Sequence, residues 1–249
     1  MKVQYDEDQV LGRGCYAIVF RGTFNRQPVA VKRIQLIDAS GEEEEAALCS
    51  LHHPNVVKLV HSENDAHFKY HALELCAASL DQLFLSDKDP KKYRGAMPPY
   101  DLIVLLQLAT GLEYIHLNDL VHGDVRPENV LISTGTAGSR QRVLMKWADF
   151  GLCRTDENGK WKRSNWVAPE LIEQLDEDSR HPAGKRRTRI ATFESDIFSE
   201  GCVFFYFLLG GIHPFGPHWE ITSNIVRNKP INFISIAYAR TMLYSNIIT

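Results

Sequence analysis

Three polar residues in the middle of the chain have a spacing that strongly limits the folds it can adopt. His122-Gly123-Asp124-Val125-Arg126-Pro127-Glu128-Asn129 sets an aspartate and an asparagine five residues apart, and Asp149-Phe150-Gly151 follows a short β-like run. Phosphoryl transfer from a nucleotide needs carboxylate and amide oxygens to hold Mg²⁺, and a group that orients the attacking hydroxyl. Asp124, Asn129 and Asp149 match these needs, and Arg126 adds a cation for the γ-phosphate. We therefore expect a fold that gathers these side chains.

A glycine turn near the N-terminus lies between two β-like runs. Gly12 and Gly14 would let the backbone approach phosphate oxygens there, although a G-x-G pattern alone is more often an ordinary turn. Lys32 follows in a β-branched run, where strand alternation places Ala30 and Lys32 on one face. A small residue there leaves room for a flat base, and the ammonium can reach its phosphates. The alternative reading of Lys32 is an exposed strand lysine.

Hydrophobic patterning predicts that the chain up to Cys76 consists of strands and one helix, at 40–51. After Cys76 it predicts mostly helices. The expected helices cover 101–117, 195–209 and about 218–228, and the second is apolar enough to be buried on every side. Two short β-like pieces, 130–132 and 143–145, flank a connection rich in glycine, serine and threonine.

Charge and cysteine content exclude several classes of protein. The 28 Lys+Arg and 31 Asp+Glu residues nearly cancel, which argues against an affinity for nucleic acid based on a basic surface. The basic cluster at 185–189 follows acidic residues and favours a solvated loop over an RNA site. Five scattered cysteines without a C-x-x-C pair indicate free thiols in a reducing compartment. We expect a cytoplasmic chain with no signal peptide and no membrane span.

Taken together, the motifs make the chain resemble the eukaryotic protein kinase family from about residue 10 to residue 217. Ala168-Pro169-Glu170 and Asp196 complete the set already described. Within kinases, the chain is most similar to the inositol-requiring kinase/endoribonucleases of the unfolded-protein response and to ribonuclease L. The resembling phrases are Leu73-Glu74-Leu75-Cys76-Ala77-Ala78-Ser79-Leu80, Asp149-Phe150-Gly151-Leu152-Cys153, Asp196-Ile197-Phe198-Ser199 and His213-Pro214-Phe215-Gly216.

The resemblance implies an α+β, bilobal protein kinase fold. It places a small antiparallel-sheet N-lobe with one helix at 1–76, an incomplete, mostly helical C-lobe at 77–230 and a divergent tail at 231–249. The C-lobe looks truncated, because the later kinase helices and the arginine that pairs with Glu170 are not recognisable. Glu170 is therefore expected to be buried without its partner, at a cost of about 3–5 kcal/mol.

The resemblance also implies roles for individual residues. Asp124, Lys32 and Arg126 would be catalytic, Asn129 and Asp149 would hold Mg²⁺, and Glu44 would pair with Lys32. Leu73 would be the gatekeeper beside the adenine. The expected ATP-binding residues are Leu11, Gly12, Gly14, Val19, Ala30, Lys32, Glu44, Glu74, Cys76 and Leu131.

Three departures from the kinase pattern bear on activity. Gly123 stands where most kinases have the arginine that receives an activation-segment phosphate, and Arg126 replaces the usual lysine. The activation segment, 149–170, is short and offers Thr155 and Ser164 for phosphorylation.

The resemblance, with these departures from it, implies two alternative functions. The first is a Ser/Thr kinase that uses ATP and Mg²⁺ and phosphorylates proteins, itself included in trans, as a homodimer in an unfolded-protein-response-like role. A full-length parent would lie on the cytosolic face of the endoplasmic reticulum. The alternative is an ATP-gated, pseudokinase-like dimerisation module with little or no catalysis.

Overall fold

The computed structural model describes residues 2–14, 17–36, 48–137, 140–149, 164–173 and 191–233. They form two compact units. The first unit draws on 1–79, 94–120 and 130–162, and the second on 80–93, 121–129 and 163–249. The chain first passes between the units after Ser79. The predicted limits 1–76, 77–230 and 231–249 stay predictions.

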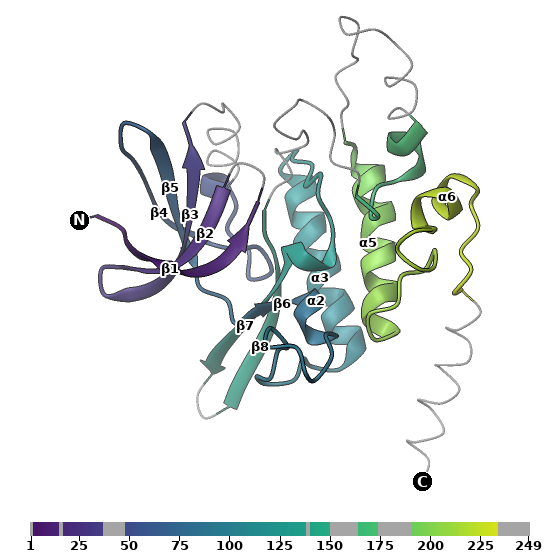
Figure 1. Cartoon of the computed structure of the whole chain (residues 1–249), viewed down its shortest axis with the longest axis horizontal. Helices are drawn as coiled ribbons and strands as arrows, with labels where there is room; N and C mark the ends of the chain where they lie inside the picture. The colour runs from purple at the N-terminus through teal and green to yellow at the C-terminus, as the bar shows by residue number, and fades with distance from the viewer. Residues whose placement is uncertain are drawn as a thin grey trace, which may run out of the picture. The chain divides into compact units, whose positions relative to one another are not determined.

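An antiparallel five-stranded sheet in the order β1-β2-β3-β5-β4 accounts for the strand-rich start of the first unit (Figure 1). Its strands are β1 (Gln4–Arg13), β2 (Ala17–Phe24), β3 (Gln27–Gln35), β4 (Leu59–Asn64) and β5 (Phe68–Glu74). On one face, Val29 and Val31 form a core with Ala72 beneath tyrosine and phenylalanine rings. Strand alternation leaves Ala30 and Lys32 on the opposite face, as expected.

Helix α3 (Asp101–Leu117) has the predicted bounds and lies against strand β8 (Arg140–Trp147) of the first unit. The Trp147 indole donates a 2.9 Å hydrogen bond to the Leu108 carbonyl. The absence of a side chain at Gly111 permits the close approach, since a Cβ there would lie 2.8 Å from the Asn55 carbonyl oxygen.

The β-like pieces at 130–132 and 143–145 belong to a longer hairpin than predicted. Strand β7 (Val130–Ala137) pairs with β8 in continuous register from Val130–Trp147 to Ala137–Arg140, and β6 (Ala78–Ser79) flanks β7. The polar residues that suggested a loop pair through their backbones, which does not require apolar side chains. In the apolar run 56–60, strand β4 begins only at Leu59, because Val57 instead donates its N–H to the Trp147 carbonyl.

The second unit contains α2 (Leu80–Leu83), a 3₁₀ turn η1 (Pro127–Asn129), α5 (Phe193–Leu208) and α6 (Ile221–Val226). Residues 169–173 are also helical. Its apolar cluster joins residues from three of these segments and the turn before α6, namely Ile172, Cys202, Phe215, Ile221 and Ile225. No helix among the described ranges is both long and apolar enough to cross a bilayer.

Two expectations for this unit are wrong. Helix α5 is not buried on every side, since 58% of the Ile197 surface is exposed. Glu170 is exposed rather than buried. In the helical turn at 169–173 it is Ile172 that faces the core, with 4% of its surface exposed. Since the Glu170 carboxylate is exposed to solvent, no buried charge is left without its partner at this position.

Candidate active site

The segment that carries Asp124 is held by a buried carboxylate at the start of α5. Thr192 caps this helix: its hydroxyl accepts from the Ser195 N–H, and the Ser195 hydroxyl accepts from the Thr192 N–H. The next residue, Asp196, is 2% exposed. Its two oxygens accept the N–H groups of His122 at 2.7 Å and Gly123 at 2.9 Å. Both carboxylate oxygens therefore fix the backbone immediately before Asp124.

The glycine at position 123 has a local structural reason. Its φ angle is +75°, in the left-handed region that side chains with a Cβ rarely adopt. An arginine here would strain the backbone while its N–H was held by Asp196. Glycine at position 123, where most kinases have arginine, thus suits the left-handed backbone conformation that leads into Asp124.

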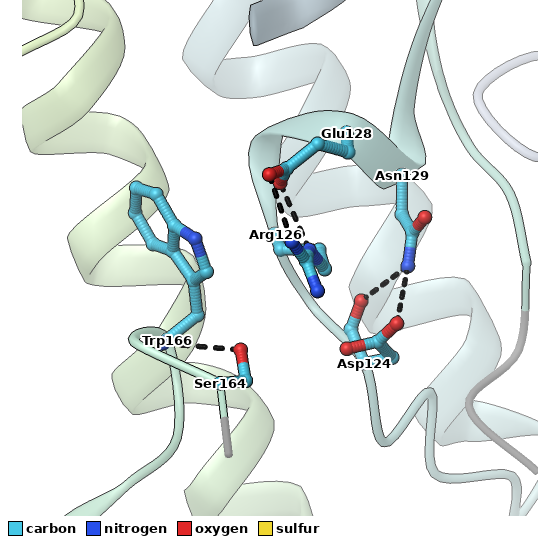
Figure 2. Close-up of polar contacts among 6 residues, drawn as sticks. All are labelled: Asp124, Arg126, Glu128, Asn129, Ser164 and Trp166. Atoms are coloured by element: carbon cyan, nitrogen blue, oxygen red, sulfur yellow. Dashed lines mark hydrogen bonds and ion pairs between the residues drawn. The ribbon is translucent and has the colours of Figure 1, made fainter. Parts of the chain in front are cut away.

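Asp124 and Asn129 lie within hydrogen-bonding distance, as Figure 2 shows. The Asn129 side-chain nitrogen donates to the Asp124 carbonyl and to its Oδ2, both at 2.8 Å. The side-chain oxygen of Asn129 is then its remaining acceptor, which suits a cation ligand. The predicted base and one predicted Mg²⁺ ligand thus belong to one hydrogen-bonded cluster.

Arg126 forms a two-pronged ion pair with Glu128, a residue that the sequence analysis did not single out. Its Nε and Nη2 donate to the two Glu128 oxygens at 2.9 and 2.8 Å (Figure 2). This hydrogen bonding raises the pKa of Arg126 against the opposing effect of burial, and the charges of Glu128, Asp124 and Asp81 add to it. The available signal was the spacing Arg-Pro-Glu, because a proline starting a tight turn brings its neighbours together.

Trp166 fixes the end of the activation segment beside α5. The Ser199 hydroxyl donates to the Trp166 carbonyl at 2.6 Å, and the Trp166 ring meets Tyr206 and His213 edge-on. The Trp166 N–H donates to the Ser164 hydroxyl at 3.3 Å (Figure 2). Thr155, the other predicted phosphorylation site, lies outside the described residues.

In the first unit, Lys32 and Asp149 form a direct ion pair. The Lys32 Nζ lies 2.5 Å from the Asp149 Oδ1, and Lys32 is 9% exposed. Asp149 has a φ angle of +60°, a conformation that aspartate tolerates better than most residues. Glu44, the predicted partner of Lys32, lies outside the described residues, as do Phe150 and Gly151.

Four of the predicted nucleotide-binding residues, Gly12, Val19, Ala30 and Lys32, share a face of the five-stranded sheet. Gly12 on β1 pairs with Val19 on β2, and Val19 pairs in turn with Lys32 on β3. Ala30 on β3 pairs with Leu73 on β5. The Gly14 N–H closes a turn by donating to the Ala17 carbonyl. Leu11 is 46% exposed. Leu131 lies on β7 opposite Lys146.

The last residue of β5 forms an ion pair with β8 that the sequence analysis missed. Glu74 binds Lys146 at 2.8 Å and also accepts the Lys58 N–H, so its carboxylate is engaged. Nearby, burial and the Glu74 charge raise the pKa of the Cys76 thiol to about 12. Cys76 is therefore a protonated thiol at neutral pH and a poor nucleophile.

Part of the predicted site comes together within each unit. Lys32 contacts Asp149 in the first, and Asp124 contacts Asn129 in the second. The two predicted Mg²⁺ ligands, Asn129 and Asp149, belong to different units. Within the described ranges, no group of three or more His, Cys, Asp and Glu side chains is arranged to hold a metal ion.

Comparison with known proteins identifies similar chains over most of this length. The family model "Protein kinase domain" matches residues 5–243. The human serine/threonine-protein kinase/endoribonuclease IRE2 is 36% identical, with 92% of this chain and 24% of the relative covered. The Caenorhabditis elegans serine/threonine-protein kinase/endoribonuclease ire-1 is 32% identical, covering 92% and 23%. The Schizosaccharomyces pombe "Sensor for unfolded proteins in the ER ire1" is 34% identical, covering 89% and 22%. The chain thus spans about a quarter of the length of these relatives.

Proposed function

This chain belongs to the protein kinase family, which confirms the fold class expected from its motifs, and from that premise we propose that it transfers the γ-phosphate of ATP to serine or threonine hydroxyls of proteins. The observation that carries the proposal is the fixed segment around Asp124. The Asp196 carboxylate holds the backbone before it, and Asn129 donates to its carboxylate. Positioned groups of this kind supply most of the catalysis in phosphoryl transfer.

The residues of the second unit would act on the hydroxyl and the transferred group. The Asp124 carboxylate would orient the hydroxyl and accept its proton while the oxygen bonds to the γ-phosphorus. The bond from phosphorus to the β,γ-bridging oxygen breaks, which leaves ADP. Arg126 would offset the charge that develops on the transferred group.

The residues of the first unit would hold the nucleotide. Lys32 would bind phosphate oxygens, with Glu44 as its second partner, and the Ala30 face of the sheet would accept the adenine. The Asp149 carboxylate of this unit and the Asn129 amide oxygen of the second unit each have the chemistry that Mg²⁺ prefers. Mg²⁺ held by such groups would neutralise phosphate charge.

The relatives suggest where such an activity would be used. Two are named as kinase/endoribonucleases and one as a sensor for unfolded proteins. We extend this to a signalling kinase that phosphorylates a second copy of itself in trans as a homodimer, on the cytosolic face of the endoplasmic reticulum.

Intact mass before and after incubation with Mg²⁺ and ATP tests the proposal, with Asp124→Asn as the matched variant. We expect added phosphate in the original chain and none in the variant. Peptide mapping then shows whether Ser164 or Thr155 is modified. Equal phosphate on both proteins would reject the role of Asp124.

The ion pair between Lys32 and Asp149 favours a second candidate, the ATP-gated dimerisation module. It engages two groups that the transfer reaction needs for phosphate and metal. If that module is the function, ATP raises the melting temperature and promotes dimers, while no phosphate is added at any concentration of chain.

A further inference from the structure

The pair between Arg126 and Glu128 depends on a local turn. Pro127 opens η1, where the missing N–H of proline is not needed, and the Asn129 N–H donates to the Arg126 carbonyl at 3.0 Å. This 3₁₀ turn separates Arg126 and Glu128 by two residues and brings their side chains together. The pair is therefore an outcome of the loop that also carries Asp124 and Asn129.

The pair engages one edge of the guanidinium and leaves another edge available for binding. Glu128 accepts from Nε and Nη2, so the hydrogens on Nη1 and the second hydrogen on Nη2 point elsewhere. Figure 2 shows the third nitrogen of Arg126 directed away from Glu128. A guanidinium has five donors in a rigid plane, so fixing one edge also orients the other.

Charge alone does not distinguish Glu128 from its neighbours. Glu128, Asp124 and Asp81 all contribute negative charge near Arg126, but Glu128 makes the paired hydrogen bonds. A lysine at position 126 would be a point charge without a planar edge, and Glu128 would lose the paired contact. The arginine and the glutamate thus form a matched set.

We infer that Glu128 is a positioning residue that holds Arg126 with its outer edge presented to the terminal phosphate of a nucleoside triphosphate. This rests on the proposed function, which assigns Arg126 to the γ-phosphate. The arrangement makes Glu128 a determinant of the preference for a triphosphate over a diphosphate. Removing the Glu128 carboxylate has two opposing effects on phosphate binding. It strengthens binding by taking away a nearby negative charge, and it weakens binding because Arg126 is no longer held in place.

The ordering effect is the larger one. The Glu128 side chain is 42% exposed, so water weakens the repulsion between its charge and a bound phosphate. An arginine side chain that is not held in place must lose its rotamer freedom when it binds the phosphate. Releasing Arg126 should therefore lower the preference for the triphosphate about fivefold.

Titration calorimetry of the whole chain with Mg²⁺ measures this preference without requiring catalysis. The ligands are ADP and the non-hydrolysable ATP analogue adenylyl imidodiphosphate. The quantity is the Kd of ADP divided by the Kd of the analogue, which is high when the triphosphate is preferred. We expect Glu128→Gln to lower the ratio about fivefold. The same change in an Arg126→Lys background should produce no further fall. Asp81→Asn, which removes a neighbouring charge without touching the paired hydrogen bonds, should not lower the ratio.

Three results would overturn the inference: an unchanged or higher ratio in Glu128→Gln, an equal fall in the Arg126→Lys background, or no preference in the original chain. The mass experiment judges phosphotransfer separately. A chain that adds no phosphate but shows the coupled change in ratio would reject the proposed kinase activity and keep the role of Glu128.

Discussion

His213 lies in the core of the second unit with 6% of its surface exposed. Its Nδ1 accepts the Phe215 N–H at 3.1 Å, and its ring meets the Trp166 ring edge-on. Burial lowers the pKa of His213 to about 4, and the backbone of Asn165 offsets this only in part. The neutral imidazole is therefore the form that the native packing accommodates.

The depressed pKa of His213 predicts acid sensitivity. An unfolded histidine titrates near 6.5, so between pH 6.5 and about 4 the unfolded chain holds a proton that the native chain lacks. The free energy of unfolding should accordingly keep its highest value above pH 6.5, as far as His213 determines it, and fall by about 3 kcal/mol as the pH approaches 4. Denaturant unfolding across this range measures the fall.

His213→Asn is the test variant, because an asparagine oxygen can also accept the Phe215 N–H. Its free energy of unfolding should be lower but less dependent on pH between 4 and 6.5. The exposed His52, changed to Asn, serves as the control and should retain the original pH dependence. Parallel pH profiles for the original chain and His213→Asn would contradict this assignment.

At this scale, sequence spacing identified residues but not their partners. The five-residue spacing of Asp124 and Asn129 predicted a shared site, and their hydrogen bond agrees. The contact of Lys146 with Glu74 was not predicted, since a strand lysine has no distinctive pattern. The contact of Glu128 with Arg126 was missed although the Arg-Pro-Glu spacing offered a signal. Such ion pairs depend on side-chain directions that follow only from the folded backbone.

Two glycines show how packing decides the effect of the same substitution in different helices. A Cβ at Gly111 in α3 would lie 2.8 Å from a carbonyl oxygen of Asn55 and 3.0 Å from the Trp147 ring. A Cβ at Gly201 in α5 would meet nothing within 4 Å. Alanine favours a helix over glycine by about 1 kcal/mol at either position.

We therefore predict opposite signs for the two alanine substitutions. Gly111→Ala should destabilise the chain by about 1–3 kcal/mol, because the neighbouring backbone must move. Gly201→Ala should stabilise it by up to about 1 kcal/mol. Thermal and urea unfolding of both variants measure the changes. A stabilising Gly111→Ala would show that α3 lies farther from Asn55 than the structure has it.

Elements were predictable where side-chain periodicity and burial coincide. Helix α3 was predicted with its observed bounds, because its apolar residues recur at helical spacing over four turns. Hairpin β7–β8 was underestimated, because residues such as Gly135 and Thr136 pair through the backbone and have no apolar alternation. Helix α5 was found, but Ile197 shows that an apolar residue need not be buried.

For the molecule as a whole, motif order predicted the fold where periodicity could not. No apolar pattern links Lys32 to Asp149, which are 117 residues apart and form an ion pair. The resemblance placed both residues in one nucleotide site. It did not predict the contacts at 231–233, which lie in the segment that was expected to be a divergent tail.

Residues 231–233 are attached to the turn at Pro214–Gly216. The Asn232 N–H donates to the Pro214 carbonyl at 3.1 Å, and its side-chain amide donates to the His213 carbonyl at 2.8 Å. The Ile231 side chain lies over Gly216, where a Cβ would be 2.5 Å from it. The Phe233 ring stacks near Phe205 of α5, with centroids 6.1 Å apart. These contacts indicate that 231–233 contribute to the stability of the second unit.

Shortened chains test this contribution. A chain ending after Lys229 should have a lower free energy of unfolding than one ending after Phe233, and the difference should exceed the loss caused by Asn232→Ala. That point variant should cost about 1 kcal/mol, since its backbone N–H is retained. Lys229→Ala, at an exposed neighbouring position, should have no measurable effect. Equal stability of the two shortened chains would mean that 231–233 rest on the second unit without stabilising it, and that the core formed by α5 and α6 is sufficient by itself.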